Sequence, residues 1–199
     1  FFIISVCLTF FILKNITIDL LFYTILISAA FFLFFTTLKD LFFQKGNNIS
    51  QTLGHFGFSL FILSILFNNI LSSEIITNIK VGERYNFNKG EIFFEKIDEM
   101  KGANFNSIIG YFKITNKNNK VIKLKPELRI YNQPPIITSE ADIKTTLLED
   151  RFLAMNIVKG DEYFNIRYQV KPFMLWIWIS VLLISFSGLL SLFKRKYEK

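Results

Sequence analysis

Cysteine and histidine are almost absent from this sequence of 199 residues. The one cysteine, Cys7, stands inside an apolar run, so the chain has no disulfide framework, no CxxC redox pair and no thiolate metal site. The one histidine is His55, and no glycine-rich phosphate loop, HExxH motif or serine–histidine–acid set accompanies it. These absences leave no recognisable catalytic motif in the chain, and we expect no catalytic residue in it.

The sequence is too apolar for a soluble protein. Hydrophobic residues make up 51% of it, and its mean hydropathy is +0.37. The 25 phenylalanines fit the residue usage of an A+T-rich genome better than a functional aromatic cluster. The net charge of +7 is not arranged as a continuous basic stripe with interleaved aromatics, so we expect no nucleic-acid partner. The composition predicts a membrane protein.

Four apolar segments divide the chain. Three of them reach the roughly 20 residues that a helix needs to cross a ~30 Å hydrocarbon core. The first segment is shorter because the sequence begins inside it, at Phe1 and without the features of a signal peptide, so we expect a fragment. The segments are residues 1–13, 20–38, 53–71 and 173–193.

A polar block of residues 72–170 separates the last two apolar segments and is long enough to be a small domain. Short runs within it alternate apolar and polar residues or concentrate β-branched and aromatic ones, which is typical of strands. These runs are "EIFFEKI", "SIIGYFKIT", "KVIKLKPELRIY" and "EYFNIRYQV", and the turns between them are "KG", "NKNN" and "KGDE". For "EADIKTTLLEDRFLAMNI" we expect a short turn followed by a strand.

The predicted fold is therefore a multi-pass α-helical membrane protein with an extracytoplasmic antiparallel β domain between its last two helices. Residues 1–71 hold three helices, residues 72–170 form the β domain, and residues 171–199 form the final helix and a basic tail. The tail "KRKYEK" predicts a cytoplasmic or matrix-side C-terminus by the positive-inside rule. The β domain and loop 14–19 then lie outside, where Lys14 fits poorly, and loop 39–52 lies inside. Trp176 and Trp178 suit the outer headgroup region.

His55 lies within "TLGHFGFSLFILSIL", inside the third apolar segment. Ionisable residues in membrane helices are costly and usually face a partner, a cavity or a cofactor. The residues alone leave two interpretations open: a histidine hydrogen-bonded between helices, or an axial ligand of haem iron. Gly54 and Gly57 would allow either a helix or a flat ring to approach closely.

The polar block carries several acids and arginines that form either a site or, as we favour, a solvated ion-pair network. Pro134 and Pro135 favour an extended surface edge or loop, because proline cannot donate to a sheet ladder. We expect Arg129 to pair with Glu127 or Glu140 and to hold that edge in shape. The charged residues are Glu127, Arg129, Glu140, Asp142, Glu149, Asp150 and Arg151.

Ordered motifs in the C-terminal three quarters of the chain carry a family resemblance. They are Pro126-Glu127, Arg129-x-Tyr131, Thr138-Ser139-Glu140-Ala141 and the strand from Asp150 to Leu153. "GHFGFSLFILSI" precedes them, and "VKPFMLWIWISVLLISFSGLL" follows them. Over Leu53 to Lys196, this order resembles the C-terminal region of the CcmF/NrfE family, the haem lyase membrane subunits of cytochrome c maturation.

The resemblance implies that His55 is one axial ligand of a haem b, and thus a ligand of its iron, among the membrane helices. The family's second ligand, and its tryptophan-rich loop with two flanking histidines, match nothing in this chain. Either the upstream part is not included, or a split gene supplies it as another polypeptide. Glu127, Arg129, Tyr131 and Glu140 would belong to a scaffold or docking surface.

The implied partners are a haem chaperone and apocytochrome c, whose CxxCH cysteines receive the haem vinyl groups. The implied location is the bacterial inner membrane with a periplasmic β domain, or the mitochondrial inner membrane if the gene is organellar. The alternative is a non-enzymatic membrane-anchored assembly or transport component. In that alternative the outer β domain binds a partner and His55 is a packing residue.

Overall fold

The computed structural model describes residues 1–13, 20–43, 49–117, 119–158 and 162–197. The chain divides into two compact units. The helical unit comprises residues 1–71 and 172–199, and the β unit comprises residues 72–171. Loop 14–19 lies outside the described residues, and so does most of the predicted "KGDE" turn.

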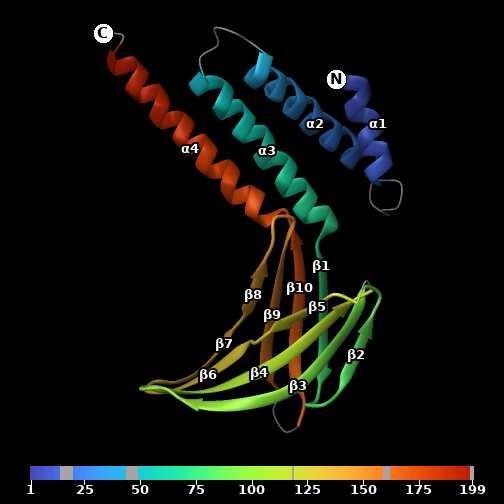
Figure 1. Ribbon diagram of the computed structural model, residues 1–199, viewed down its shortest axis with the longest axis vertical. Coiled ribbons are helices and arrows are strands. Elements are labelled where there is room, and N and C mark those ends of the chain that lie inside the picture. The colour runs from blue at the N-terminus through green and yellow to red at the C-terminus, as the bar shows by residue number, and fades with distance from the viewer. Residues whose placement is uncertain (14–19, 44–48, 118, 159–161, 198–199) are drawn as a thin grey trace. The chain divides into compact units, whose positions relative to one another are not determined.

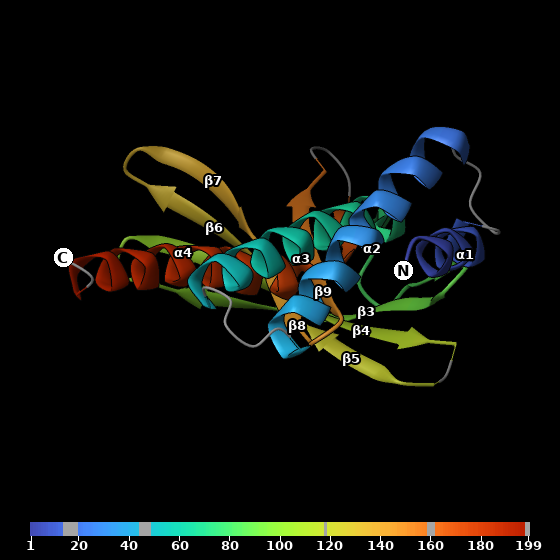
Figure 2. The same cartoon turned by 90° about the horizontal axis from the view of Figure 1, so that it is seen from above.

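The helical unit contains α1 (Phe2–Leu13), α2 (Leu20–Phe43), α3 (Ile49–Leu71) and α4 (Met174–Tyr197). Figures 1 and 2 show α3 between α2 and α4. Stretches of α2, α3 and α4 are long and apolar enough to cross a membrane, whereas α1 is a shorter apolar helix. Helix α2 continues to Phe43 and α3 begins at Ile49, so much of the predicted loop 39–52 is helical. Hydropathy marks the apolar part of a helix, and backbone hydrogen bonds continue past it into polar residues.

Small and hydroxyl side chains bring neighbouring helices together. Between α3 and α4, Ser50 Oγ donates to the Ser187 carbonyl at 2.6 Å, and Ser187 Oγ donates to the Ser50 carbonyl at 2.6 Å. The hydroxyl oxygens of Thr37 on α2 and Ser59 on α3 lie 3.1 Å apart. Such contacts are typical of membrane helices, where small residues permit close approach and hydroxyls bond across the interface.

The β unit forms two sheets, shown in Figure 1. One sheet has the strand order β1-β10-β9-β8, and the other has the order β2-β3-β4-β6-β7 with β5 also paired to β4. Every strand pairing with a described register is antiparallel. The strands are β1 (Ser73–Ile79), β2 (Arg84–Phe87), β3 (Gly90–Lys101), β4 (Phe105–Asn116), β5 (Val121–Leu124), β6 (Glu127–Asn132), β7 (Pro135–Glu140), β8 (Asp142–Thr145), β9 (Glu149–Ile157) and β10 (Phe164–Pro172).

One apolar core joins the two sheets. Phe94 and Phe112 stack at a centroid distance of 4.1 Å, and the edge of Phe164 meets the Phe94 ring at 5.5 Å. Alternate residues of each strand supply this core because successive side chains point to opposite faces of a sheet. The buried members are Ile79, Ile92, Phe94, Phe112, Ile114, Leu124, Leu128, Leu153, Met155, Ile166 and Tyr168. The predicted β domain is confirmed.

Three strands differ from the sequence prediction. β1 and β2 were not expected, and Asp142–Thr145 forms strand β8 where a turn was expected. These strands are short or follow a helix closely, so the alternation of apolar and polar residues in their sequence is weak. Each is stabilised by pairing with a longer neighbouring strand. The "KG" turn is present, and Gly90 is required there because a Cβ at this position would lie 2.1 Å from the Thr115 carbonyl oxygen.

Candidate functional site

His55 lies on an open face of α3. Its side chain is exposed, and its imidazole makes no hydrogen bond to another described residue. The other faces of α3 are covered, since Ser59 faces Thr37 of α2 and Ser50 faces Ser187 of α4. The exposed residues spaced along the open face are Gln51, His55, Phe58, Ile65 and Asn69. Their spacing of three, four or seven residues forms one stripe along the helix.

A small polar pocket adjoins His55 between α2 and α3. It has a volume of about 120 Å³, and its lining residues all carry polar side chains. The sequence prediction did not include this pocket, because its residues come from two helices and three of the five lie in the predicted loop 39–52. The lining residues are Thr37, Asp40, Gln51, Thr52 and His55. His55 therefore stands where a polar cavity meets an uncovered helix face.

Gly54 and Gly57 serve the contact between α3 and α4. A Cβ on Gly54 would lie 2.6 Å from Ser187 Oγ, and a Cβ on Gly57 would lie 3.0 Å from Ile184 Cγ1. Of the two roles that the sequence left open for these glycines, the structure shows the approach of a helix. Because both glycines face α4, the space beside His55 is separate from the contact that they make.

The expected Arg129–Glu127 pair is present on β6. Arg129 Nε donates to Glu127 Oε1 at 3.1 Å, and Arg129 Nη2 donates to Glu127 Oε2 at 3.2 Å. The guanidinium lowers the pKa of Glu127 below its usual value of 4.5. Tyr131 lies two residues further along the strand, where its ring contacts that of Phe105 at 5.5 Å. Arg129 also lies over the Phe105 ring, at 5.1 Å.

Glu140 lies on β7, directly opposite Glu127 in the strand register. β7 begins at Pro135 and ends the order of its sheet, so the proline-containing segment is an edge strand. The structure thus brings together Glu127, Arg129, Tyr131 and Glu140 on two paired strands. Their arrangement supports an ion pair and aromatic packing at a sheet edge, and it contains no nucleophile beside a base.

The remaining charged residues of the predicted network lie on the other sheet. Arg151 of β9 forms an ion pair with Glu149, and Arg151 Nη1 donates to the side-chain oxygen of Asn116 on β4 at 3.3 Å. The Arg151 side chain is only 11% exposed. Asp150, between the two, is 9% exposed, and its Oδ1 has no hydrogen-bond partner among the described residues. The seven charged residues therefore form separate groups.

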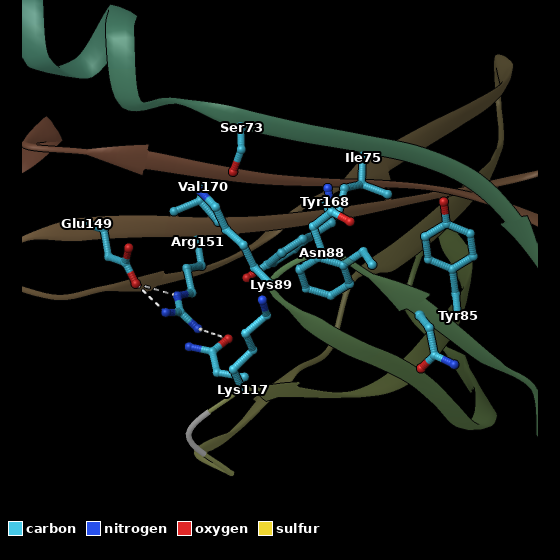
Figure 3. A pocket seen from close by; sticks show the side chains of 13 residues that line it. Ser73, Ile75, Tyr85, Asn88, Lys89, Lys117, Glu149, Arg151, Tyr168 and Val170 are labelled. Atoms are coloured by element: carbon cyan, nitrogen blue, oxygen red, sulfur yellow. Dashed lines mark hydrogen bonds and ion pairs between the residues drawn. The ribbon is translucent and has the colours of Figure 1, made fainter. Parts of the chain in front are cut away.

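A cavity of about 720 Å³ in the β unit contains the Arg151 group (Figure 3). Tyr168 forms part of its wall, and burial raises the pKa of that phenol. The sequence prediction did not identify this cavity, because its lining comes from strands far apart in the chain. The lining residues are Ser73, Ile75, Tyr85, Asn86, Phe87, Asn88, Lys89, Asn116, Lys117, Glu149, Arg151, Tyr168 and Val170.

The described residues include no group of three or more histidine, cysteine, aspartate or glutamate side chains that could hold a metal ion. His55 can therefore supply one ligand to a metal centre and not a complete set. An imidazole can serve as a single protein ligand to a metal whose other ligands come from a bound macrocycle or from another polypeptide. The exposed imidazole and the uncovered helix face fit such a group.

Comparisons with known proteins agree with this fold. Residues 70–172 match a family model described as the CcmF C-terminal beta-sandwich. The chain is 29% identical over 146 residues to the cytochrome c-type biogenesis protein CcmF of Pseudomonas fluorescens, covering 73% of this chain and 22% of that protein. It is 24% identical over 178 residues to NrfE of Haemophilus influenzae, covering 88% of this chain and 28% of that protein.

A solved structure of "Cytochrome c Heme Lyase CcmF" shares the fold, with a TM-score of 0.67 and 16% sequence identity. The similarity covers 95% of this chain and 33% of that one. This chain thus spans less than a third of the length of the two curated relatives. The family model of the C-terminal β sandwich matches more than half of this chain. The chain belongs to the CcmF/NrfE family and corresponds to its C-terminal part.

Proposed function

We propose that this chain forms the C-terminal part of a haem lyase subunit that attaches haem covalently to apocytochrome c. Its helices span the bacterial inner membrane, or the mitochondrial inner membrane for an organellar gene, and its β unit lies on the outer side. His55 is one axial ligand of a haem b, and the second ligand lies outside this chain. The observation that carries the proposal is the exposed His55 imidazole on the uncovered face of α3.

The surroundings of His55 support the ligand assignment. A histidine that serves only to pack helices would be buried or would bond to a neighbour, because unpaired polar groups are costly within a membrane. His55 is exposed, and its ring lacks a partner among the described residues. The adjoining pocket offers Asp40, Gln51 and the hydroxyls of Thr37 and Thr52. Polar groups of this kind orient the second ring nitrogen of ligating histidines.

Haem b would supply electron transfer, which maintains the reduced iron that thioether formation on apocytochrome c requires. This chain's own contribution is to hold one imidazole at a defined place on α3. The contact between α3 and α4, with Gly54, Gly57, Ser50 and Ser187, prevents the helix from rotating and thereby keeps the open face directed away from α4. Catalytic residues of the attachment reaction lie outside this chain.

The β unit acts in this proposal as a scaffold or docking surface for the haem chaperone and apocytochrome c. The ion pair of Arg129 with Glu127 and the ring contact between Tyr131 and Phe105 stiffen the β6–β7 edge. An edge strand also presents unpaired backbone groups to which a partner strand can bind.

Haem spectra test the ligand assignment. The chain should be compared alone and together with the upstream part of the protein, in purified membranes. We expect weak haem binding by the chain alone, and a six-coordinate low-spin b-type spectrum for the complete assembly. His55→Ala should abolish that spectrum, and external imidazole should restore it in His55→Gly by occupying the vacated position. Asn69→Ala, on the same open face, is the control and should leave the spectrum unchanged.

An unchanged spectrum at full haem occupancy in the His55→Ala assembly would rule out the ligand assignment. His55 would then contribute to packing or to binding of the upstream part. Replacement of Cys7 by serine and of Lys120 by cysteine tests the orientation separately. A membrane-impermeant thiol reagent should label Lys120→Cys from the outer side of intact cells or spheroplasts. Labelling that requires access to the inner face would contradict the orientation.

A further inference from the structure

The turn between β8 and β9, residues 146–148, presents two adjacent leucines outside the β sandwich. Leu147 is 69% exposed and Leu148 is 63% exposed. Thr146 holds the turn, because its Oγ1 donates to the Glu149 carbonyl at 2.8 Å and accepts from the Glu149 N–H at 3.1 Å. The Thr146 N–H also donates to the Glu149 carbonyl, at 3.0 Å. The turn is thus fixed in a shape that keeps both leucines out of the core.

This turn lies at the end of its sheet where β1 begins and β10 ends (Figure 1). Ser73, the first residue of β1, pairs with Val170 near the end of β10. The Val158 N–H donates to the Tyr163 carbonyl at 3.3 Å across the connection of β9 to β10, so β9 begins at the end where β10 finishes. Ser73, Glu149 and Val170 also line the same cavity.

At this same end, the chain passes into two apolar helices. α3 ends at Leu71, two residues before β1 begins, and α4 begins at Met174, two residues after β10 ends. Both helices are long and apolar enough to cross a membrane. Since consecutive Cα atoms are about 3.8 Å apart, two such short links keep this end of the sheet close to the surface of any bilayer that α3 and α4 cross.

We infer that the Leu147–Leu148 turn inserts into the bilayer interface as a third membrane attachment of the β unit, beside its two covalent links. The partner is a phospholipid surface. Two adjacent aliphatic side chains at the bilayer interface would be buried among the acyl chains, which removes their apolar surface from water. Lys144 on β8 lies two residues before the turn, and Lys171 on β10 lies three residues before α4 begins. Both lysines place positive charge near this end of the sheet, where it can attract lipid phosphates. This inference rests on the membrane insertion of α3 and α4 in the proposed function.

Depth-dependent quenching tests the inference in the complete assembly, reconstituted in vesicles of zwitterionic and anionic phospholipids. In a Cys7→Ser background, single variants Leu147→Cys and Leu148→Cys carry a small environment-sensitive fluorophore. Val81→Cys is the matched control, because Val81 is 43% exposed in the turn at the far end of β1. Each label is quenched in turn by lipids brominated on the acyl chains and by water-soluble iodide.

We expect brominated lipid to quench the labels at residues 147 and 148 at least several-fold more than the label at residue 81. Iodide should quench the label at residue 81 more than the labels at residues 147 and 148. Equal quenching at all three positions would overturn the inference. Protection from iodide without quenching by brominated lipid would also overturn it, since a protein partner would then cover the turn. A fourth variant, Leu182→Cys on α4, carries the same label and reports helix insertion independently, since Leu182 is 69% exposed within the apolar stretch of α4. If brominated lipid quenches the label at residue 182 and not those at residues 147 and 148, this inference fails while membrane insertion stands.

Discussion

The two units of this chain place polar and apolar side chains in opposite ways. In the β unit, the buried side chains are aliphatic and aromatic, and the ion pairs lie outside the core. In the helical unit, serine and threonine are buried between helices, while large apolar side chains such as Phe11, Phe43 and Trp178 are exposed. Among the described residues, Ser107 and Asp150 are the buried polar side chains outside the helical unit.

The contrast in buried and exposed side chains fits water around the β unit and lipid around the helical unit. Water drives apolar side chains into the centre of the β unit. A lipid surrounding provides no such force between helices, because acyl chains are as apolar as leucine, so close packing and hydrogen bonds at small residues decide the contact. The same chain therefore exposes many phenylalanines on the helical unit, where Phe31 belongs to a smaller buried cluster, whereas Phe94 and Phe112 lie at the centre of the β unit.

The largest expected effect is loss of an aromatic side chain from the β core. Phe94 is fully buried and stacks on Phe112, so Phe94→Ala should destabilise the β unit by about 3–5 kcal/mol. The neighbouring Phe93 is the control, because it is only partly buried and lies under Arg84 at 4.8 Å. Phe93→Ala should cost about 0.5–1 kcal/mol. Hydrogen exchange of β4 amides in the full chain measures both, and similar exchange in the two variants would contradict the assigned core.

The second prediction concerns the contact between α3 and α4. A Cβ on Gly57 would lie 3.2 Å from Leu183 Cβ and 3.3 Å from the Ile184 backbone nitrogen. Gly57→Leu should therefore destabilise the helical unit by about 1–3 kcal/mol through overpacking. Gly188→Leu on α4 is the control, because a Cβ there has no described atom within 4 Å apart from its chain neighbours and its own helix backbone. Unfolding by SDS titration in mixed micelles compares the stability of the two variants. Equal stability of Gly57→Leu and Gly188→Leu would show that the contact does not need a small residue at position 57.

The third prediction concerns pH and the charged exterior of the β unit. The pKa of Glu127 is lower in the folded chain than its usual 4.5 because Arg129 donates to it. The ion pair therefore contributes its stability above about pH 4.5, and this contribution is lost as pH falls through the folded pKa. For this partly exposed pair we expect about 0.2–1 kcal/mol.

Glu127→Gln should remove this contribution at neutral pH and flatten the acid side of the stability profile. Hydrogen exchange of β6 and β7 amides between neutral and acidic pH gives the measurement. Glu99→Gln on β3 is the control, because Glu99 is exposed and forms no ion pair with a described residue. An acid profile that Glu127→Gln leaves unchanged would contradict a stabilising role for the pair.

The smallest expected effect is loss of one hydroxyl between helices. Ser187→Ala removes the donor to the Ser50 carbonyl and should cost about 0.6 kcal/mol. Ser185→Ala is the matched control on the same helix, because Ser185 Oγ bonds only to the Val181 carbonyl of its own helix. The same SDS titration should separate the two variants. A larger effect at Ser185 would show that bonding across the helix interface is not what stabilises the contact.

The sequence by itself determined the apolar helices and the β domain, because hydropathy over about 20 residues and alternation along a strand are local patterns. It also singled out His55, as the one histidine and as an ionisable group in an apolar run. For Arg129 the sequence left two partners open, Glu127 and Glu140, and the structure shows the pair with Glu127. Residues two apart share a face of any strand, so Glu127 could be named as a candidate without knowledge of the fold.

Only the tertiary structure decided which features come together. It assigned Gly54 and Gly57 to α4 and left His55 on an uncovered face, because helix rotation is set by neighbours and not by hydropathy. It separated Arg151 from Arg129 onto different sheets and placed Arg151 in the lining of an open cavity with Asn116 and Tyr168. Contacts between residues far apart in the chain depend on strand order and register, and no local pattern of residues encodes either of them.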